Sequence, residues 1–136
     1  MAWPAGPGSY TVSMPANAES ESTFTLYRRG IELLADEDYE QATEQLERAA
    51  RRAPEKASIR EALGRAYFHS GRFALAAVEF RAVVEAHQVN DYAHFCLGRA
   101  LSKTGDTEQA RHHLALASNL RPERGDYRFY RDQLSA

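Results

Sequence analysis

Apolar residues recur along residues 23–124 at intervals of three and four positions, the spacing that places them on one face of an α-helix. The runs end at short polar or glycine-containing breaks at 35–38, at Gly71 and at Gly105. Ser22 or Thr23 can cap the first helix through a side-chain oxygen. The pattern predicts short amphipathic helices joined by tight turns.

The helical pattern repeats with a fixed period. Gly30, Gly64 and Gly98 stand 34 residues apart, and the segment LGRAY at 63–67 returns as LGRAL at 97–101. A period of this length indicates a repeated two-helix unit. The sequence therefore predicts three units, at 23–56, 57–90 and 91–124.

Equivalent places in the three units hold residues of similar size. Small residues face large ones at regular intervals: glycine at the eighth place, alanine at the twentieth, and a large apolar residue at the twenty-fourth (Leu46, Phe80 and Leu114). A glycine on one helix that faces an alanine on the next lets the two backbones approach closely, while the large residue fills the space beside them. Pro54 and Pro122 close the first and third units, because proline cannot sit inside a helix.

These residues resemble the tetratricopeptide repeat family over 23–124. The resemblance implies an all-α fold, a right-handed α-solenoid of three antiparallel helix-pair repeats. Several positions depart from the family pattern. Polar residues replace large apolar ones at Arg29, Arg60 and His94, and Glu37 replaces the glycine of the first turn. Thr107 replaces the aromatic residue in the third unit, and Gln88 replaces the proline in the second.

The segments on either side of the repeats have different characters. Residues 125–136 predict a C-terminal capping helix, in which Asp126 can serve as the cap and Tyr127, Tyr130 and Leu134 share one face. Residues 1–21 are rich in proline, glycine and polar residues, and we expect a disordered N-terminal arm before a folded domain at 22–136.

Composition excludes several classes of protein. The formal net charge of −2 predicts no electrostatic attraction to nucleic acid. The single cysteine rules out an intramolecular disulfide and fits a reducing compartment. The sequence contains neither an apolar run long enough to span a membrane nor a secretory signal. We therefore expect a cytoplasmic protein that binds neither nucleic acid nor membranes.

The family resemblance implies a concave groove lined by the first helix of each unit, where a peptide binds. The positions that face this groove carry aromatic, basic and a few other side chains, namely Tyr27, Ile31, Glu61, Arg65, Phe68, His69, Tyr92, Phe95, Arg99 and Lys103. Arg65 and Arg99 are equivalent places, so we expect them about 10 Å apart, one helix packing distance. Each guanidinium can bind a carboxylate through two N–H groups, and the aromatic residues offer rigid contact area. We therefore predict a protein or peptide ligand with acidic and apolar residues. The alternative is that the two arginines are solvated groove residues and the aromatic residues pack locally.

The resemblance also argues against one kind of ligand. Family members that bind chaperone C-terminal tails hold the terminal carboxylate with lysine, asparagine and arginine side chains. The matching places here are Tyr27, Ile31, Ala62, Tyr92 and Cys96. None of them carries the required group, so this carboxylate clamp is not expected.

No cluster of residues in the sequence has the pattern of a catalytic or metal site. Cys96 and His94 are two positions apart on a helix and point in different directions, so Cys96 is expected to be a buried or groove-edge thiol. Adjacent His112 and His113 cannot converge on one metal, and Glu108 with His112 offers too few ligands for structural zinc. We expect no enzyme activity, no cofactor and no metal.

Three functional interpretations remain open. The leading one is a non-catalytic interaction module, or adaptor, that binds a partner through the groove. A second is a self-associating scaffold whose groove is filled by its own N-terminal arm or by a second copy. A third is a regulatory subunit of an enzyme, which the sequence does not distinguish from the first.

Overall fold

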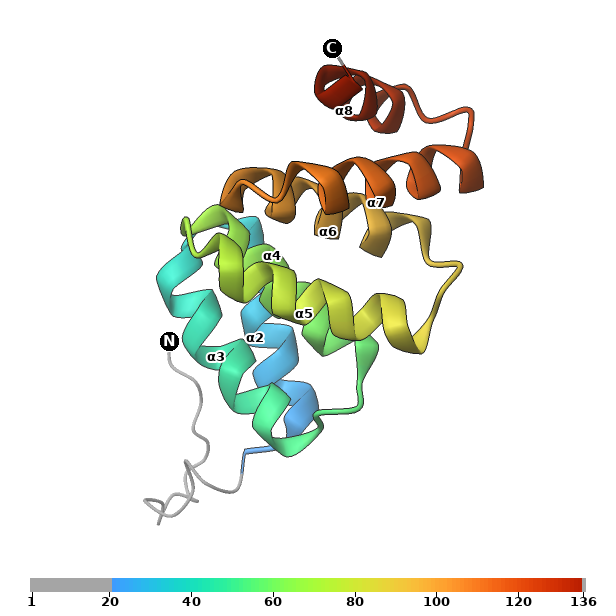
Figure 1. Ribbon diagram of the computed structural model, residues 1–136. Coiled ribbons are helices and arrows are strands. Elements are labelled where there is room, and N and C mark those ends of the chain that lie inside the picture. Colours follow the sequence, from blue (N-terminus) through green and yellow to red (C-terminus); the bar gives the residue numbers. More distant parts are fainter. Residues whose placement is uncertain (1–20, 136) are drawn as a thin grey trace, which may run out of the picture.

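The computed structural model describes residues 21–135 as a stack of antiparallel helix pairs (Figure 1). The helices of this range are α2 (Thr23–Ala35), α3 (Tyr39–Arg52), α4 (Ala57–His69), α5 (Phe73–Ala86), α6 (Asp91–Thr104), α7 (Thr107–Leu120) and α8 (Gly125–Ser135). Each helix packs on the one before it. The first helices of neighbouring units also contact each other, α2 with α4 and α4 with α6. The predicted all-α solenoid of helix pairs is confirmed.

Four of the described helices begin after a residue whose side chain caps the helix. Ser22 caps α2, since its hydroxyl accepts the Thr25 N–H at 3.0 Å, and side chains before α3, α6 and α7 cap those helices in the same way. The turns within the three units share one left-handed residue at equivalent places: Glu37 (φ 61°), Gly71 (φ 84°) and Gly105 (φ 93°). Only the first unit therefore places a residue with a side chain in a conformation that favours glycine.

The repeated glycines bring the two helices of each unit together. A Cβ on Gly30 would lie 2.5 Å from the Leu46 side chain, and one on Gly64 would lie 2.8 Å from the Phe80 ring. A Cβ on Gly98 would lie 2.7 Å from Leu114. The large residue at the twenty-fourth place thus occupies the space that a Cβ would need. The alanine at the twentieth place is fully buried in every unit.

Two of the polar departures from the family pattern have partners in the structure. Arg29 pairs with Glu21 at 2.8 Å, and Glu21 also reaches Arg48 at 3.0 Å, which joins the start of the described chain to α2 and α3. Arg60 donates to the Pro54 carbonyl at 2.7 Å and to Glu79 at 2.6 Å. These polar side chains replace apolar packing with ion pairs at the rim of the stack.

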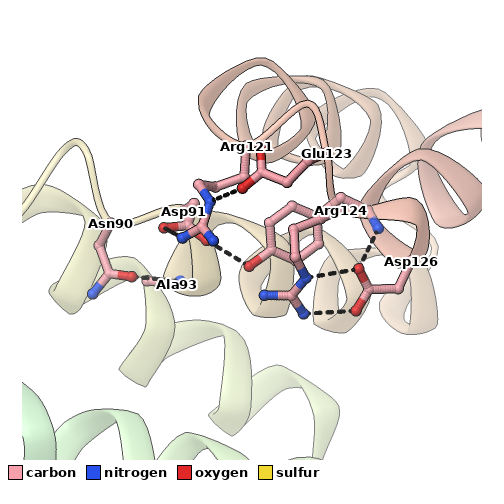
Figure 2. Close-up of polar contacts among 8 residues, drawn as sticks. Asn90, Asp91, Ala93, Arg121, Glu123, Arg124 and Asp126 are labelled. Carbon is pink, nitrogen blue, oxygen red and sulfur yellow. Dashed lines mark hydrogen bonds and ion pairs between the residues drawn. The ribbon is translucent and has the colours of Figure 1, made fainter.

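Helix α8 closes the C-terminal end of the described stack. Tyr127 is fully buried, stacks on Phe95 with ring centroids 4.7 Å apart and donates its hydroxyl to Asp91 at 2.7 Å. Figure 2 shows the polar contacts around this joint, where the Arg124 guanidinium lies 4.4 Å from the Tyr127 ring centroid and pairs with Asp126 at 2.7 Å. The helix begins at Gly125, so Asp126 lies in its first turn and accepts the Tyr127 N–H at 2.9 Å.

The predicted N-terminal arm at 1–21 lies outside the described residues, apart from Glu21. The alternative in which this arm fills the groove therefore also lies outside the described residues and stays a prediction. Within residues 21–135, no helix combines the length and the apolar character needed to cross a membrane.

Candidate functional site

A pocket of about 70 Å³ opens between α4 and α6. Six of the predicted groove residues line it together with Phe80, which was not predicted to face it, and Cys96, which was expected to be a buried or groove-edge thiol. Its wall consists of Arg65, Phe68, His69, Phe80, Tyr92, Phe95, Cys96 and Arg99. We call it the α4–α6 pocket. The 34-residue period explains it, because equivalent faces of neighbouring first helices are turned toward the same space.

Arg99 lies against two aromatic rings, one in the pocket wall and one on α8. Its guanidinium carbon lies 5.0 Å from the Phe68 ring centroid and 4.2 Å from that of Tyr130 on α8. Such cation–π contacts orient the guanidinium without consuming its N–H donors in ion pairs. Tyr130 was predicted as part of the capping helix and not as part of the site, and the sequence carried no signal for this contact.

The charges around the pocket are mostly positive. Burial lowers the pKa of His69 below its ordinary value, and the nearby guanidinium groups of Arg65 and Arg99 lower it further. Glu61 is the opposing charge: burial raises the pKa of its carboxyl, and Arg65 partly reverses this effect. The positive field disfavours protonation of His69 and favours an anion in the pocket.

Cys96 contributes a thiol to the pocket wall. Its side chain is buried, and burial raises the pKa of the thiol to about 12. The thiol is therefore protonated at neutral pH, and the thiolate that a nucleophile or metal ligand requires is not formed. Burial also raises the pKa of the neighbouring Tyr92 hydroxyl. The pocket thus offers binding surface and charge, and its cysteine lacks the activation that catalysis needs.

The remaining predicted groove residues lie outside the α4–α6 pocket. Tyr27 and Ile31 of α2 are half-buried and pack against the apolar core. Lys103 lies 5.7 Å from the Phe73 ring centroid and lines a neighbouring hollow together with Arg99 and Tyr130. The predicted set is therefore divided between one pocket, its flanks and the face of α2.

A buried histidine pair was missed by the sequence interpretation. His94 and His113 lie with their Nδ1 atoms 3.0 Å apart, and His94 Nε2 lies 2.9 Å from the Gln88 carbonyl oxygen. A carbonyl only accepts, so His94 carries its proton on Nε2 and its Nδ1 accepts a hydrogen bond from His113 Nδ1–H. Burial, together with His94, His112 and Arg81, lowers the pKa of His113 to about 4. His113 is therefore neutral at pH 7, and the pair is buried between α6 and α7.

The part of the chain from 21 to 135 contains no cluster of three or more His, Cys, Asp or Glu side chains arranged to hold a metal ion.

Comparison with known proteins identifies similar sequences and structures. A family model of the tetratricopeptide repeat matches residues 27–91. No curated protein sequence matches the chain.

Several solved structures share the fold. The first tetratricopeptide repeat domain of Spaghetti (RPAP3), bound to the HSP90 peptide SRMEEVD, has a TM-score of 0.78 at 18% identity, over 83% of this chain and 90% of that one. MamA from Desulfovibrio magneticus RS-1, from residue 41 to its end, has a TM-score of 0.82 at 24% identity, over 88% and 67%. MamA MSR-1 has a TM-score of 0.75 at 29% identity, over 81% and 63%.

Proposed function

Because this chain is a tetratricopeptide repeat protein, we propose that it is a non-catalytic interaction module that binds an acidic and apolar peptide segment in the α4–α6 pocket. The observation that carries the proposal is the pairing of two guanidinium groups with aromatic walls in one pocket. An acidic side chain of the ligand accepts hydrogen bonds from Arg65 and Arg99, and an adjacent apolar side chain contacts Phe68 and Tyr92.

The positioning of Arg99 supports this role. A guanidinium held between Phe68 and Tyr130 loses little conformational freedom when a ligand binds, so more of the interaction energy appears as affinity. Glu61 limits the attraction, since Arg65 already lowers the pKa of its carboxyl through their electrostatic attraction. We therefore propose that Arg99 supplies the stronger anchor and that Arg65 adds selectivity for a second acidic group.

The ligand we propose differs from the one bound by the RPAP3 domain, whose structure contains an HSP90 peptide. The five places of the carboxylate clamp hold no basic or amide group in this chain, and two of them, Ala62 and Cys96, are buried. Recognition here would depend on side-chain carboxylates along a segment and would not require a terminal carboxylate.

Fluorescence anisotropy with a labelled peptide of alternating glutamate and phenylalanine tests the proposal. We expect the Arg65→Glu, Arg99→Glu double variant to weaken binding at least about tenfold, since charge-assisted hydrogen bonds are worth roughly 1.5–3 kcal/mol each. A peptide with glutamine in place of glutamate should bind the unaltered protein with similarly reduced affinity.

The matched control carries the same change of charge away from the pocket. Arg51 and Arg52 are exposed at the end of α3, and the Arg51→Glu, Arg52→Glu variant should bind as the unaltered protein does. Thermal unfolding of all variants confirms that each is folded. Equal affinity for the glutamate and glutamine peptides, or full affinity in the Arg65, Arg99 variant, would rule out this function.

A further inference from the structure

The outer faces of the three second helices differ sharply in character. At the eighteenth, nineteenth and twenty-second places, α3 presents Glu40, Gln41 and Glu44, and α7 presents Glu108, Gln109 and His112. At the same places α5 presents Ala74, Leu75 and Val78, and all nine residues are exposed. Because the three helices occupy equivalent positions in the stack, the fold alone does not require an apolar surface on α5.

The apolar face of α5 continues along the helix. Leu75 is 47% exposed and Val78 is 59% exposed, and Ala82 and Ala86 extend the same face by one and two turns. In Figure 1 no described element lies over the near side of α5, which is drawn in yellow-green. Contiguous apolar surface of this kind is typical of contact sites.

A hollow beside this face can receive a side chain. It is lined by residues of α5 and by the C-terminal end of α6, namely Ala74, Ala77, Val78, Arg81, Ala82, Glu85, Leu101 and Thr104. Small alanine side chains form much of its floor. A second helix could therefore approach α5 closely and insert a branched side chain, as in helix packing inside a protein.

The charges at the ends of α5 suit a second copy of the same helix. Arg72 precedes α5 and pairs with Glu40 of α3 at 2.9 Å, and Glu85 lies in the last turn of α5. Both Arg72 and Glu85 are exposed. In an antiparallel pair with Val78 on the two-fold axis, Ala74 of one copy faces Ala82 of the other. The same register brings Glu85 of each copy to the start of the other α5, beside Arg72, where the helix dipole also favours an anion. In the same register Leu75 lies opposite Arg81, which lines the hollow.

We propose that two copies of this chain associate through an antiparallel α5–α5 contact centred on Val78. The contact involves a different helix face from the α4–α6 pocket and leaves the pocket open. A helix of 14 residues is about 21 Å long. An interface of that length is small, so we expect a weak dimer with a Kd on the order of tens of micromolar.

Sedimentation equilibrium of the full chain over a concentration range from about 5 to 500 µM measures this association. The unaltered protein should shift from monomer to dimer across the range. Val78→Glu places two carboxylates at the axis and should raise the dissociation constant at least about tenfold. Val89→Glu is the matched control: Val89 is 78% exposed, lies beyond the end of α5 and gives the same change of charge.

Cross-linking tests the position of the axis. Val78→Cys in a Cys96→Ser background should form a disulfide-linked dimer with oxidised glutathione, while Val89→Cys in the same background should not. A chain that stays monomeric at every concentration overturns the proposal and leaves the α5 face to a different protein. A dimer that Val78→Glu and Val89→Glu affect equally overturns it as well.

Discussion

At the scale of single residues, Glu37 stands out because its backbone takes a left-handed conformation (φ 61°). A side chain in that region costs roughly 1–2 kcal/mol, and glycine avoids the cost while losing some stability through its freer unfolded state. We expect Glu37→Gly to raise the free energy of unfolding by about 0.5 kcal/mol, measured by urea denaturation.

The equivalent turns of the second and third units already carry glycine, so the reverse substitution can be made there. Gly71 and Gly105 have positive φ, and no atom lies within 4 Å of a Cβ added to either, so steric contact does not complicate the comparison. Gly71→Ala should cost about 1 kcal/mol for backbone strain alone. If Glu37→Gly destabilises the protein, interactions of the glutamate side chain stabilise this turn by more than its left-handed backbone conformation costs.

His113 makes stability depend on pH. The unfolded chain takes up a proton as the pH falls through the ordinary value of 6.5, whereas the folded chain does so only near pH 4. The stabilisation is therefore complete above about pH 6.5 and is lost progressively at lower pH, by roughly 2 kcal/mol between about pH 7 and pH 5. Urea midpoints at these two pH values measure the loss.

Replacing both partners isolates this effect. The His94→Leu, His113→Leu variant removes the donor and the acceptor together, so we expect a smaller loss of stability between the two pH values. Replacement of the exposed His87 by glutamine should leave the loss unchanged. The same pH dependence in the double variant would assign it to other groups.

At the scale of helices, the close approach within each unit depends on its glycine. Gly64→Ala places a Cβ 2.8 Å from the Phe80 ring, which must move within a filled core. We expect a loss of about 1–3 kcal/mol in thermal or urea unfolding, although alanine is intrinsically the better helix residue.

Gly125 offers the matched control. It lies in the first turn of α8, and a Cβ there would approach no atom more closely than the Arg128 guanidinium at 3.7 Å. Gly125→Ala should therefore be neutral or slightly stabilising. A Gly64→Ala variant as stable as Gly125→Ala would show that the α4–α5 contact has room to relax.

The helices were predictable from the sequence because their determinants are local and repeated. The glycine period, the turn residues and the alternation of small and large side chains each occur three times. The pocket was predictable in part for the same reason: Arg65 and Arg99 are equivalent places, so the repeat turns both toward one space. Contacts that occur once had no such signal. The stacking of Tyr130 on Arg99 and the His94–His113 pair join elements whose relative placement depends on packing.

At the scale of the whole molecule, α8 protects the end of the described stack. Tyr127 of this helix is fully buried, covers Phe95 and reaches Asp91, 36 positions earlier. We expect Tyr127→Ala to cost about 3–5 kcal/mol, since it removes a buried aromatic ring and leaves the Asp91 carboxylate without this donor. Differential scanning calorimetry should show a lower Tm.

A second aromatic residue of α8, which is exposed, serves as the control for the buried Tyr127. Phe129 is 55% exposed, and Phe129→Ala should cost less than about 1 kcal/mol. Tyr127→Ala should also weaken binding of the acidic peptide, since α8 carries the Tyr130 ring that orients Arg99. Equal melting temperatures for the two variants would show that α8 contributes little to the stack.

The lone cysteine in the pocket wall makes the site chemically addressable. Cys96 is the only thiol in the sequence, so a thiol-specific reagent labels one known position without prior removal of other cysteines. Its high pKa and its burial predict slow modification, and a bound peptide should slow it further. The rate of labelling thus becomes a reporter of pocket occupancy that can be used before any natural partner is known.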